Sequence, residues 1–154
     1  MNSLQLKCAI NSVPCLKQQV KGVFSRDNLP GKVFQFPSAY ICNTDYSTGP
    51  GIHWIAIRFN SPETCEFFDS FGQFPSKYGP EFCDFIDKNS KICVFNNVKL
   101  QGTNSDTCGY HVLYYLIMIC LNINFKMLVN GLYNHKDADN FVYQYITNVL
   151  NRYK

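Results

Sequence analysis

The chain has 154 residues, a net charge of +3 and a composition that is 46% hydrophobic and 16% charged. This balance excludes a disordered chain, and the length suits one domain, so we expect a single domain over residues 1–154. The first residues lack the apolar stretch of a signal peptide, and the longest apolar run, Val112 to Leu121, is too short to cross a bilayer. We therefore expect an intracellular, non-secreted monomer with no membrane partner.

Eight cysteines would suit a small secreted disulfide scaffold, but their spacing shows no framework and no C-x-x-C motif. The three histidines do not pair with cysteines at the spacing of a zinc site. We therefore expect reduced cysteines, no metal and no small-molecule cofactor. The chain is mildly basic up to Ala39, which permits binding to DNA or an acidic partner, although solvated lysines on an ordinary surface are the commoner explanation of such a charge.

The predicted elements begin with a helix over residues 3–20, which Pro14 must end or kink. A short strand over residues 40–43 follows. Two further strands, over residues 53–59 and 64–69, are separated by a tight connection and predict an antiparallel hairpin.

The second half of the chain predicts a helix over residues 75–88, a strand over 91–98 and an amphipathic helix over 137–152. Residues 108–121 are apolar on nearly every face of a helix, so this helix should be central and buried. We therefore expect an α+β fold, in which a small, mostly antiparallel sheet packs between helices and Cys108 opens the central buried helix.

Cys108 is the strongest candidate nucleophile, because a turn rich in Gly, Thr, Asn and Ser precedes it and a buried helix follows. Free backbone N–H groups at a helix N-terminus stabilise a thiolate, which lowers the thiol pKa and makes it reactive. Gly109 would let the backbone approach a substrate carbonyl. By residue type alone, a small buried cysteine is the commoner explanation, and the preceding turn is what distinguishes Cys108.

A histidine and a carboxylate are expected at the same end of the predicted hairpin. His53 begins the first strand after a glycine-containing loop, and Asp69 ends the second. If the strands pair, Asp69 can accept the imidazole N–H and fix the orientation of the ring. The simpler alternatives are a partly exposed strand histidine and an aspartate that ends a strand. Trp54 is expected to wall the site, a role compatible with core packing.

Gln101 lies seven residues before Cys108, and its side-chain N–H can join the Cys108 backbone N–H as an oxyanion donor. A glutamine before a glycine carries little meaning alone. His111, one helical turn after Cys108, is a weaker candidate base because its own segment contains no acid to orient it. His135 lies in a polar loop and is expected at the surface.

These motifs, in this order and with these gaps, resemble the adenain family of adenovirus-type cysteine endopeptidases, which is related more distantly to the SUMO-specific proteases. The similarity covers most of the chain, from about residue 30 to residue 121. The segments that carry it are Gly51-Ile52-His53-Trp54, Phe68-Asp69-Ser70-Phe71-Gly72 and Gln101-Gly102-x-Asn104-Ser105-x-x-Cys108-Gly109.

The resemblance implies a catalytic triad of Cys108, His53 and Asp69, with Gln101 in the oxyanion hole. It also implies cleavage of capsid and core precursor proteins during virion maturation, in the virion and the host cell nucleus, with a preference for small residues, especially glycine, around the scissile bond. It further implies activation by DNA and by a short peptide, held through a disulfide that would fall at Cys93. The chain is shorter than the family pattern before Gln101 and after Cys108, which a compact relative from another virus or virus-like element would explain.

Three functions compete. The leading hypothesis is a viral or virus-like cysteine endopeptidase. An isopeptidase that removes ubiquitin-like modifiers would use the same site, but it needs a surface that grips a folded modifier, and the chain shows no evident extra segment for this. A non-catalytic DNA- or capsid-binding protein would keep the fold without the chemistry, and the presence of all four site residues argues against it.

Overall fold

The computed structural model describes all 154 residues. The strands are β1 (Val20–Ser25), β2 (Ser38–Asn43), β3 (Trp54–Phe59), β4 (Thr64–Phe68) and β5 (Ile92–Phe95). The helices are α1 (Ser3–Ser12), α2 (Pro14–Gln19), α3 (Pro80–Asn89), α4 (Cys108–Cys120), α5 (Phe125–Tyr133) and α6 (Ala138–Asn151), together with a short 3-10 helix η1 (Pro75–Tyr78).

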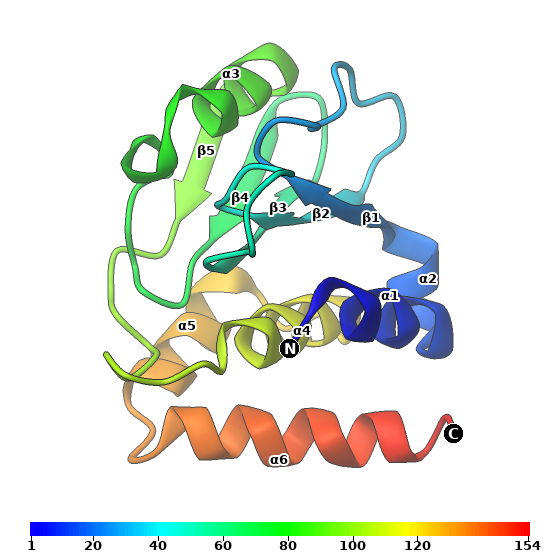
Figure 1. The fold of residues 1–154 in the computed structure, drawn as a ribbon, viewed down its shortest axis with the longest axis vertical. Coiled ribbons are helices and arrows are strands. Elements are labelled where there is room, and N and C mark those ends of the chain that lie inside the picture. The colour runs from blue at the N-terminus through cyan, green and yellow to red at the C-terminus, as the bar shows by residue number, and fades with distance from the viewer.

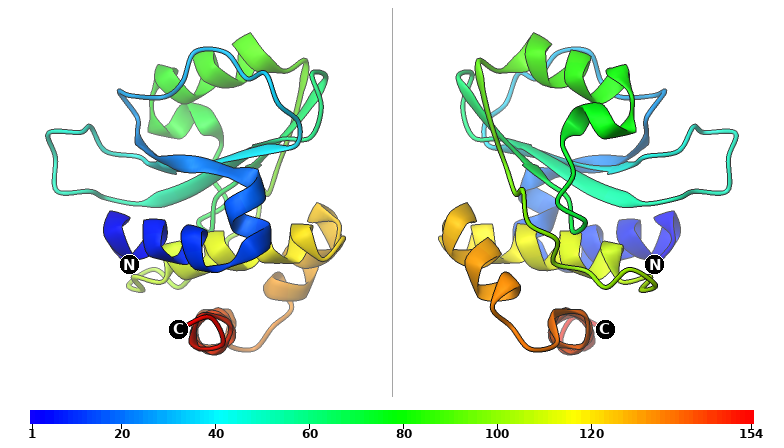
Figure 2. Two further views of the ribbon diagram at one scale, coloured as in Figure 1. Left: turned by 90° about the vertical axis from the view of Figure 1, so that its right-hand side faces the viewer. Right: turned by 90° about the vertical axis from the view of Figure 1, so that its left-hand side faces the viewer.

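The five strands form one sheet in the order β1-β2-β3-β4-β5, which lies between two unequal helical layers (Figure 1). α3 and η1 cover one face of the sheet. α1, α4 and α5 cover the other face, and α6 packs outside α4 as a further layer (Figure 2). No helix combines the length and the apolarity needed to cross a bilayer.

The central strand β3 divides the core between these layers. Alternate side chains of a strand point to opposite faces of the sheet. Trp54 and Ala56 therefore join the larger hydrophobic cluster against α4, while Ile55, Ile57 and Phe59 join the smaller cluster beneath α3. Because both faces are covered, β3 is an almost continuous apolar run. Its start, next to His53, is thereby held firmly between two packed layers.

The helix α4 begins at Cys108, as predicted, and most of its residues are buried. The side chain of Thr107, directly before it, makes no capping hydrogen bond to the first turn. The first backbone N–H groups of a helix have no partner within the helix, so here they remain available to an anion beside Cys108. The helix ends before Asn122, whose φ of 63° lies in the left-handed region typical of helix ends.

The sheet is mixed, and the expectation of a mostly antiparallel sheet was wrong. β3 pairs antiparallel with β2 and with β4, which confirms the hairpin. The two outer pairings, β1 with β2 and β4 with β5, are parallel. Parallel neighbours need long crossover connections, and these were not evident from local turn signals.

Several predicted boundaries also differ from the structure. The helix expected over residues 75–88 is divided into η1 and α3 at Gly79, which has a φ of 109°. The strand expected over residues 91–98 ends at Phe95. Pro14 divides the first helix into α1 and α2, as predicted. Two elements, β1 and α5, were not predicted.

Candidate active site

His53 and Asp69 meet at one end of the β3–β4 hairpin, where the sheet approaches the start of α4. The imidazole Nε2 of His53 lies 2.6 Å from Oδ1 of Asp69, and both side chains are buried. Since Nε2 is engaged by the carboxylate, Nδ1 is the nitrogen that is left for a thiol. The structure therefore brings the predicted base and its predicted carboxylate into direct contact.

The carboxylate of Asp69 is fully buried and accepts four hydrogen bonds. Oδ1 accepts the His53 bond and the N–H of Phe71 at 3.0 Å, while Oδ2 accepts the N–H of Gln73 at 3.0 Å and the hydroxyl of Tyr78 at 2.6 Å. Burial acts to raise the pKa of Asp69, but the bonds from His53 and Tyr78 outweigh it, so this pKa lies below its usual value. Asp69 is thus a fixed negative charge.

The backbone at Asp69 is held by Asn96, from the loop after β5. The side-chain oxygen of Asn96 accepts the Asp69 N–H at 2.9 Å, and its side-chain nitrogen donates to the Asp69 carbonyl. Asn96 is itself buried. These two hydrogen bonds fix the backbone at the end of β4, which holds the Asp69 carboxylate next to His53.

The thiol of Cys108 lies against His53 at the N-terminus of α4. Burial acts to raise the pKa of this thiol, but a hydrogen bond with His53 and the backbone N–H groups of Trp54 and Gly109 outweigh it. The pKa of Cys108 therefore lies below its ordinary value. The predicted nucleophile and base are thus brought together from segments 55 positions apart in the sequence.

The pKa of His53 is shifted in the opposite sense. Burial acts to lower it, but the hydrogen bonds with Asp69 and Cys108 together raise the pKa of His53 from 6.5 to about 9. A lowered thiol pKa beside a raised imidazole pKa favours the thiolate–imidazolium pair near neutral pH. Two aromatic rings flank the imidazole, because the ring centroids of Phe71 and Tyr78 lie 4.6 Å and 5.8 Å from that of His53.

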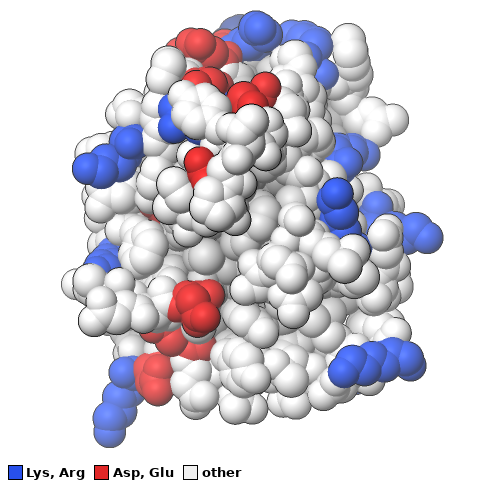
Figure 3. Space-filling view, in the orientation of Figure 1, with Lys and Arg blue, Asp and Glu red and all other residues white.

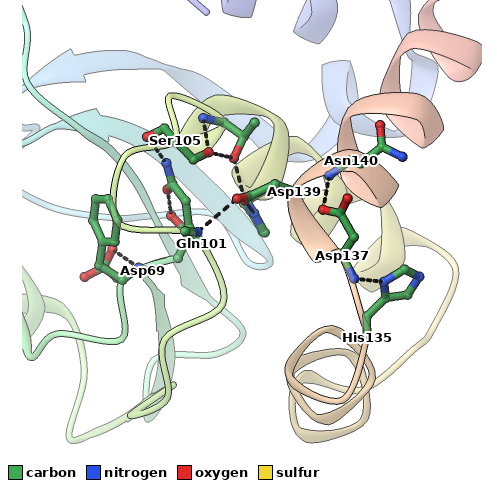
Figure 4. Close-up of polar contacts among 12 residues, drawn as sticks. Asp69, Gln101, Ser105, His135, Asp137, Asp139 and Asn140 are labelled. Atoms are coloured by element: carbon green, nitrogen blue, oxygen red, sulfur yellow. Dashed lines mark hydrogen bonds and ion pairs between the residues drawn. The ribbon is translucent and has the colours of Figure 1, made fainter.

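Gln101 is buried next to the site and its amide is held at both ends (Figure 4). Its Oε1 accepts the Ser70 hydroxyl at 2.6 Å, and its Nε2 donates to the Ser105 carbonyl at 2.7 Å. Because a carbonyl can only accept, the Gln101 atom that faces Ser105 must be the nitrogen. The second hydrogen of that nitrogen has no partner in the chain.

The loop between Gln101 and Cys108 is anchored by Asp139, in the first turn of α6 (Figure 4). Asp139 accepts the Gly102 N–H at 2.9 Å, the Thr107 hydroxyl at 2.7 Å and a bond from His111 at 2.8 Å. Acidic side chains gather where this loop meets the start of α6 (Figure 3). The most C-terminal helix therefore positions the loop that carries both Gln101 and the nucleophile.

The two remaining histidines differ from His53. His111 is fully buried, and it has an acidic partner that its own segment does not supply, Asp139 of α6. Burial, its largest influence, lowers the pKa of His111, and its Nδ1 has no hydrogen-bond partner. His135 lies exposed in the loop before α6, as predicted, and accepts the Asp137 N–H at 3.0 Å.

Trp54 and Gly109, predicted as walls of a substrate cleft, are both buried beneath Met1. The Trp54 indole N–H donates to the Met1 carbonyl at 2.8 Å. A Cβ added at Gly109 would lie 2.8 Å from the Met1 Cβ. The first residue of the chain thus packs over both, and the wall role of Trp54 and Gly109 stays a prediction.

Cys93, predicted as the attachment point of an activating peptide, faces a cysteine of its own chain. It is paired in register with Cys65 on the adjacent strand, and both thiols are free. The interaction with Cys65, the largest influence, together with burial raises the pKa of Cys93 well above its ordinary value. No three of the His, Cys, Asp and Glu side chains gather in an arrangement that could hold a metal ion.

Three supporting residues were missed from the sequence: Tyr78, Asn96 and Asp139. Each reaches the site from a distant segment, so no local spacing marks it. The position of Asp139 in the first turn of α6 is explained equally well by its favourable interaction with the helix dipole. Only the motif Phe95-Asn96-Asn97 after a strand offered a sequence signal, because asparagine commonly bonds backbone groups at such ends.

Comparison with known proteins finds sequence similarity to viral cysteine proteases. No family model matches it. It is 25% identical over 124 residues to the SUMO-1 cysteine protease S273R of African swine fever virus, covering 72% of this chain and 45% of that protein. The chain is thus distantly similar to a viral cysteine protease. It spans less than half the length of the viral relatives that it matches.

Solved structures agree on the fold. The crystal structure of the African swine fever virus pS273R protease matches with a TM-score of 0.56 at 15% identity, over 86% of this chain and 60% of that one. The central domain of the uncharacterized Lpg1148 protein from Legionella pneumophila matches with a TM-score of 0.58 at 14% identity, over 100% of this chain and 98% of that one. The mixed sheet and its helices therefore share the fold of the matched part of the viral protease and of the Legionella domain.

Proposed function

We propose that the chain is a cysteine endopeptidase with Cys108 as nucleophile, His53 as base, Asp69 as orienting carboxylate and Gln101 as oxyanion donor. The observation that carries this proposal is the buried pair of His53 and Asp69, 2.6 Å apart, beside the Cys108 thiol, accompanied by opposite pKa shifts of the thiol and the imidazole. The similarity to named viral cysteine proteases supports it.

In the acylation step, Nδ1 of His53 takes the proton of Cys108 and the thiolate adds to the scissile carbonyl. The carbonyl oxygen gains the negative charge, which the Cys108 backbone N–H and the second N–H of Gln101 stabilise. Asp69 holds the ring in place throughout and compensates the imidazolium charge. The proton then passes from His53 to the leaving amine as the carbon–nitrogen bond breaks.

In the deacylation step, neutral His53 takes a proton from water, and the hydroxide attacks the thioester carbonyl. The same two donors stabilise the second oxyanion. The intermediate collapses, the carbon–sulfur bond breaks, and the thiolate of Cys108 is restored beside the imidazolium. The hydroxyl group of the water ends in the acid product. The proton of the water replaces the one that His53 gave to the leaving amine.

The proposed substrates are capsid and core precursor proteins that are cleaved during maturation of a virus or virus-like element, within the virion and the host nucleus. This part of the proposal is supported by the resemblance to the adenain family. Activation by DNA, and by a peptide joined at Cys93, stays a prediction.

A second candidate function is removal of a ubiquitin-like modifier. The observation that favours it is the name of the viral relative, a SUMO-1 cysteine protease. Parallel assays with modifier-conjugated proteins and with short glycine-containing peptides distinguish the two. Cleavage of the peptides, at a rate unaffected by excess free modifier, favours the endopeptidase.

The assignment is tested by two measurements on the full chain. A small thiol-reactive electrophile should modify Cys108 faster than the exposed Cys8, and this advantage should vanish in the variant His53→Ala. The variant Cys108→Ala should lose all cleavage while keeping the wild-type melting temperature, whereas the control Cys8→Ala should keep full activity. Equal modification of both thiols would support a non-catalytic binding protein, and retained cleavage by Cys108→Ala would overturn the assignment.

A further inference from the structure

A shallow pocket of about 350 Å³ lies beside Phe71 and Tyr78, the two aromatic neighbours of His53. Phe71 and Tyr78, whose rings flank the His53 imidazole, form part of its wall. The remaining lining residues are polar or cationic: Gln73, Lys77, Lys99 and Thr103. The pocket is therefore separated from the His53 imidazole by the two aromatic rings that flank it.

The pocket carries two cations and no acidic lining residue. Lys77 comes from η1, and Lys99 comes from the loop between β5 and α4. Neither lysine forms an ion pair with a carboxylate of the chain. Lys99 instead donates to the hydroxyl of Thr103 at 2.6 Å and lies 5.6 Å from the ring centroid of Phe71.

The nearest carboxylate behind this wall, that of Asp69, does not neutralise the lysines. It is fully buried and already accepts four hydrogen bonds, including those from Gln73 and Tyr78. Both lysines are exposed, so their charges face solvent and an incoming ligand. The pocket thus presents an uncompensated positive charge next to the base.

The chemistry of the proposed reaction assigns the pocket to one half of the substrate. During acylation, His53 must give its proton to the leaving amine, so the leaving half of the peptide passes over the imidazole. The acyl half stays on Cys108. A pocket walled by the two rings that flank His53 therefore faces the residues that follow the scissile bond.

We propose that this pocket binds a carboxylate on the leaving side of the scissile bond, with Lys77 and Lys99 as specificity-determining residues. The inference rests on the proposed endopeptidase function and names a substrate class for the same site. The carboxylate can come from an acidic side chain or from the C-terminus of a short leaving peptide. Both sources present the same group to the two lysines.

The test uses matched peptides with the wild-type chain. Three peptides share one glycine-containing acyl half and differ after the scissile bond. The first carries Asp and an amidated C-terminus, the second, which is neutral, carries Asn and an amidated C-terminus, and the third carries Asn and a free C-terminus. Two exposed ion pairs correspond to about a 2- to 30-fold gain in kcat/KM for a carboxylate peptide over the neutral one. A gain for the first peptide identifies a side chain, and a gain for the third identifies the chain end.

The variant Lys77→Glu/Lys99→Glu should reverse the preference, so that the neutral peptide is cleaved faster. The matched controls are Lys126→Glu on α5 and a rise in salt from 0.05 M to 0.5 M. The first should keep the preference of the wild type, and the second should weaken it through screening. Cleavage of all three peptides at equal rates, or a preference that survives in the double variant, would overturn this inference alone. Absence of any cleavage, together with no selective modification of Cys108, would overturn the proposed function as well.

Discussion

The variant Asp69→Asn removes the buried negative charge behind His53 while nearly conserving side-chain shape. The rise of the His53 pKa from 6.5 to about 9 corresponds to about 3 kcal/mol of preference for the imidazolium, shared between the bonds to Asp69 and to Cys108. An adjacent opposite charge accounts for about one to three pH units of such a shift. The pKa of His53 should therefore fall by about one to two pH units in the variant.

The assay is the pH dependence of kcat/KM on a glycine-containing peptide. In the wild type, activity should rise as Cys108 ionises and fall as His53 loses its proton near pH 9. In Asp69→Asn, the alkaline fall should move toward neutral pH. We also expect kcat/KM at pH 7.5 to drop about 10- to 1,000-fold, since the ring loses both its charge partner and its fixed orientation.

The matched control is Tyr78→Phe, which deletes one of the four hydrogen bonds to Asp69 but keeps the charge and the ring beside His53. Its alkaline limit should stay near that of the wild type, with a loss of kcat/KM below about tenfold. Circular dichroism and thermal melting check that both variants fold. An alkaline limit near pH 9 with wild-type kcat/KM in Asp69→Asn would refute the reasoning.

Three further outcomes are expected. Because the pKa of His53 is raised, its protonation stabilises the folded state fully below pH 6.5, and this contribution is lost as the pH rises through about 9. Urea denaturation should therefore show that the free energy of unfolding falls across this pH window. The fall should be smaller in Asp69→Asn. Gln101→Ala should lower kcat about 100-fold with little change in KM, measured by steady-state kinetics, and an unchanged kcat would remove Gln101 from the oxyanion site. Asp139→Ala should lower the free energy of unfolding by about 1–3 kcal/mol and lower kcat, because Gly102, Thr107 and His111 lose their common acceptor. Wild-type values of both quantities would exclude an anchoring role for Asp139.

The central part of the fold could be predicted from the sequence because it is encoded locally. β3 is a nearly continuous apolar run and β4 alternates polar with apolar residues, both bounded by turn residues, and α4 is apolar on nearly all its faces. Their type and order follow from periodicity alone. The thiol at the start of α4 was likewise marked by the polar turn before it.

The missed elements have separate physical reasons. β1 is an edge strand whose register shifts after Val20, next to Gly22, so its alternation is broken. α5 did carry a signal, because Phe125, Leu128, Val129 and Leu132 recur at helical spacing and are all buried. That helix was detectable from its pattern. The parallel pairings, in contrast, depend on which strands meet in space, which no local pattern encodes.

The supporting contacts of the site could not be predicted for the same reason. Asn96 lies 27 positions from Asp69, and Asp139 lies 37 positions from Gly102. Each is a polar residue of a common type in an ordinary place. Only the folded chain makes them partners of the site.

The choice between the two buried histidines shows what decides the base. His53 and His111 both contact an aspartate, and His111 is nearer to Cys108 along the chain. A base must accept a proton and hold it. At His53, the imidazolium has Asp69 on one nitrogen and the thiolate on the other, which explains its raised pKa.

At His111, a second proton would sit on Nδ1, which is buried and has no acceptor. A buried N–H without a partner costs about 1–3 kcal/mol, in addition to the cost of burying the charge itself. Its partner Asp139 is also shared with Gly102 and Thr107, and its side chain is 25% exposed, which weakens its compensation of an imidazolium. His111 therefore stays neutral and braces the loop, which leaves His53 as the proposed base. The base is selected by which imidazolium the packed structure can stabilise, and nearness to the thiol in the sequence carries no weight in that selection.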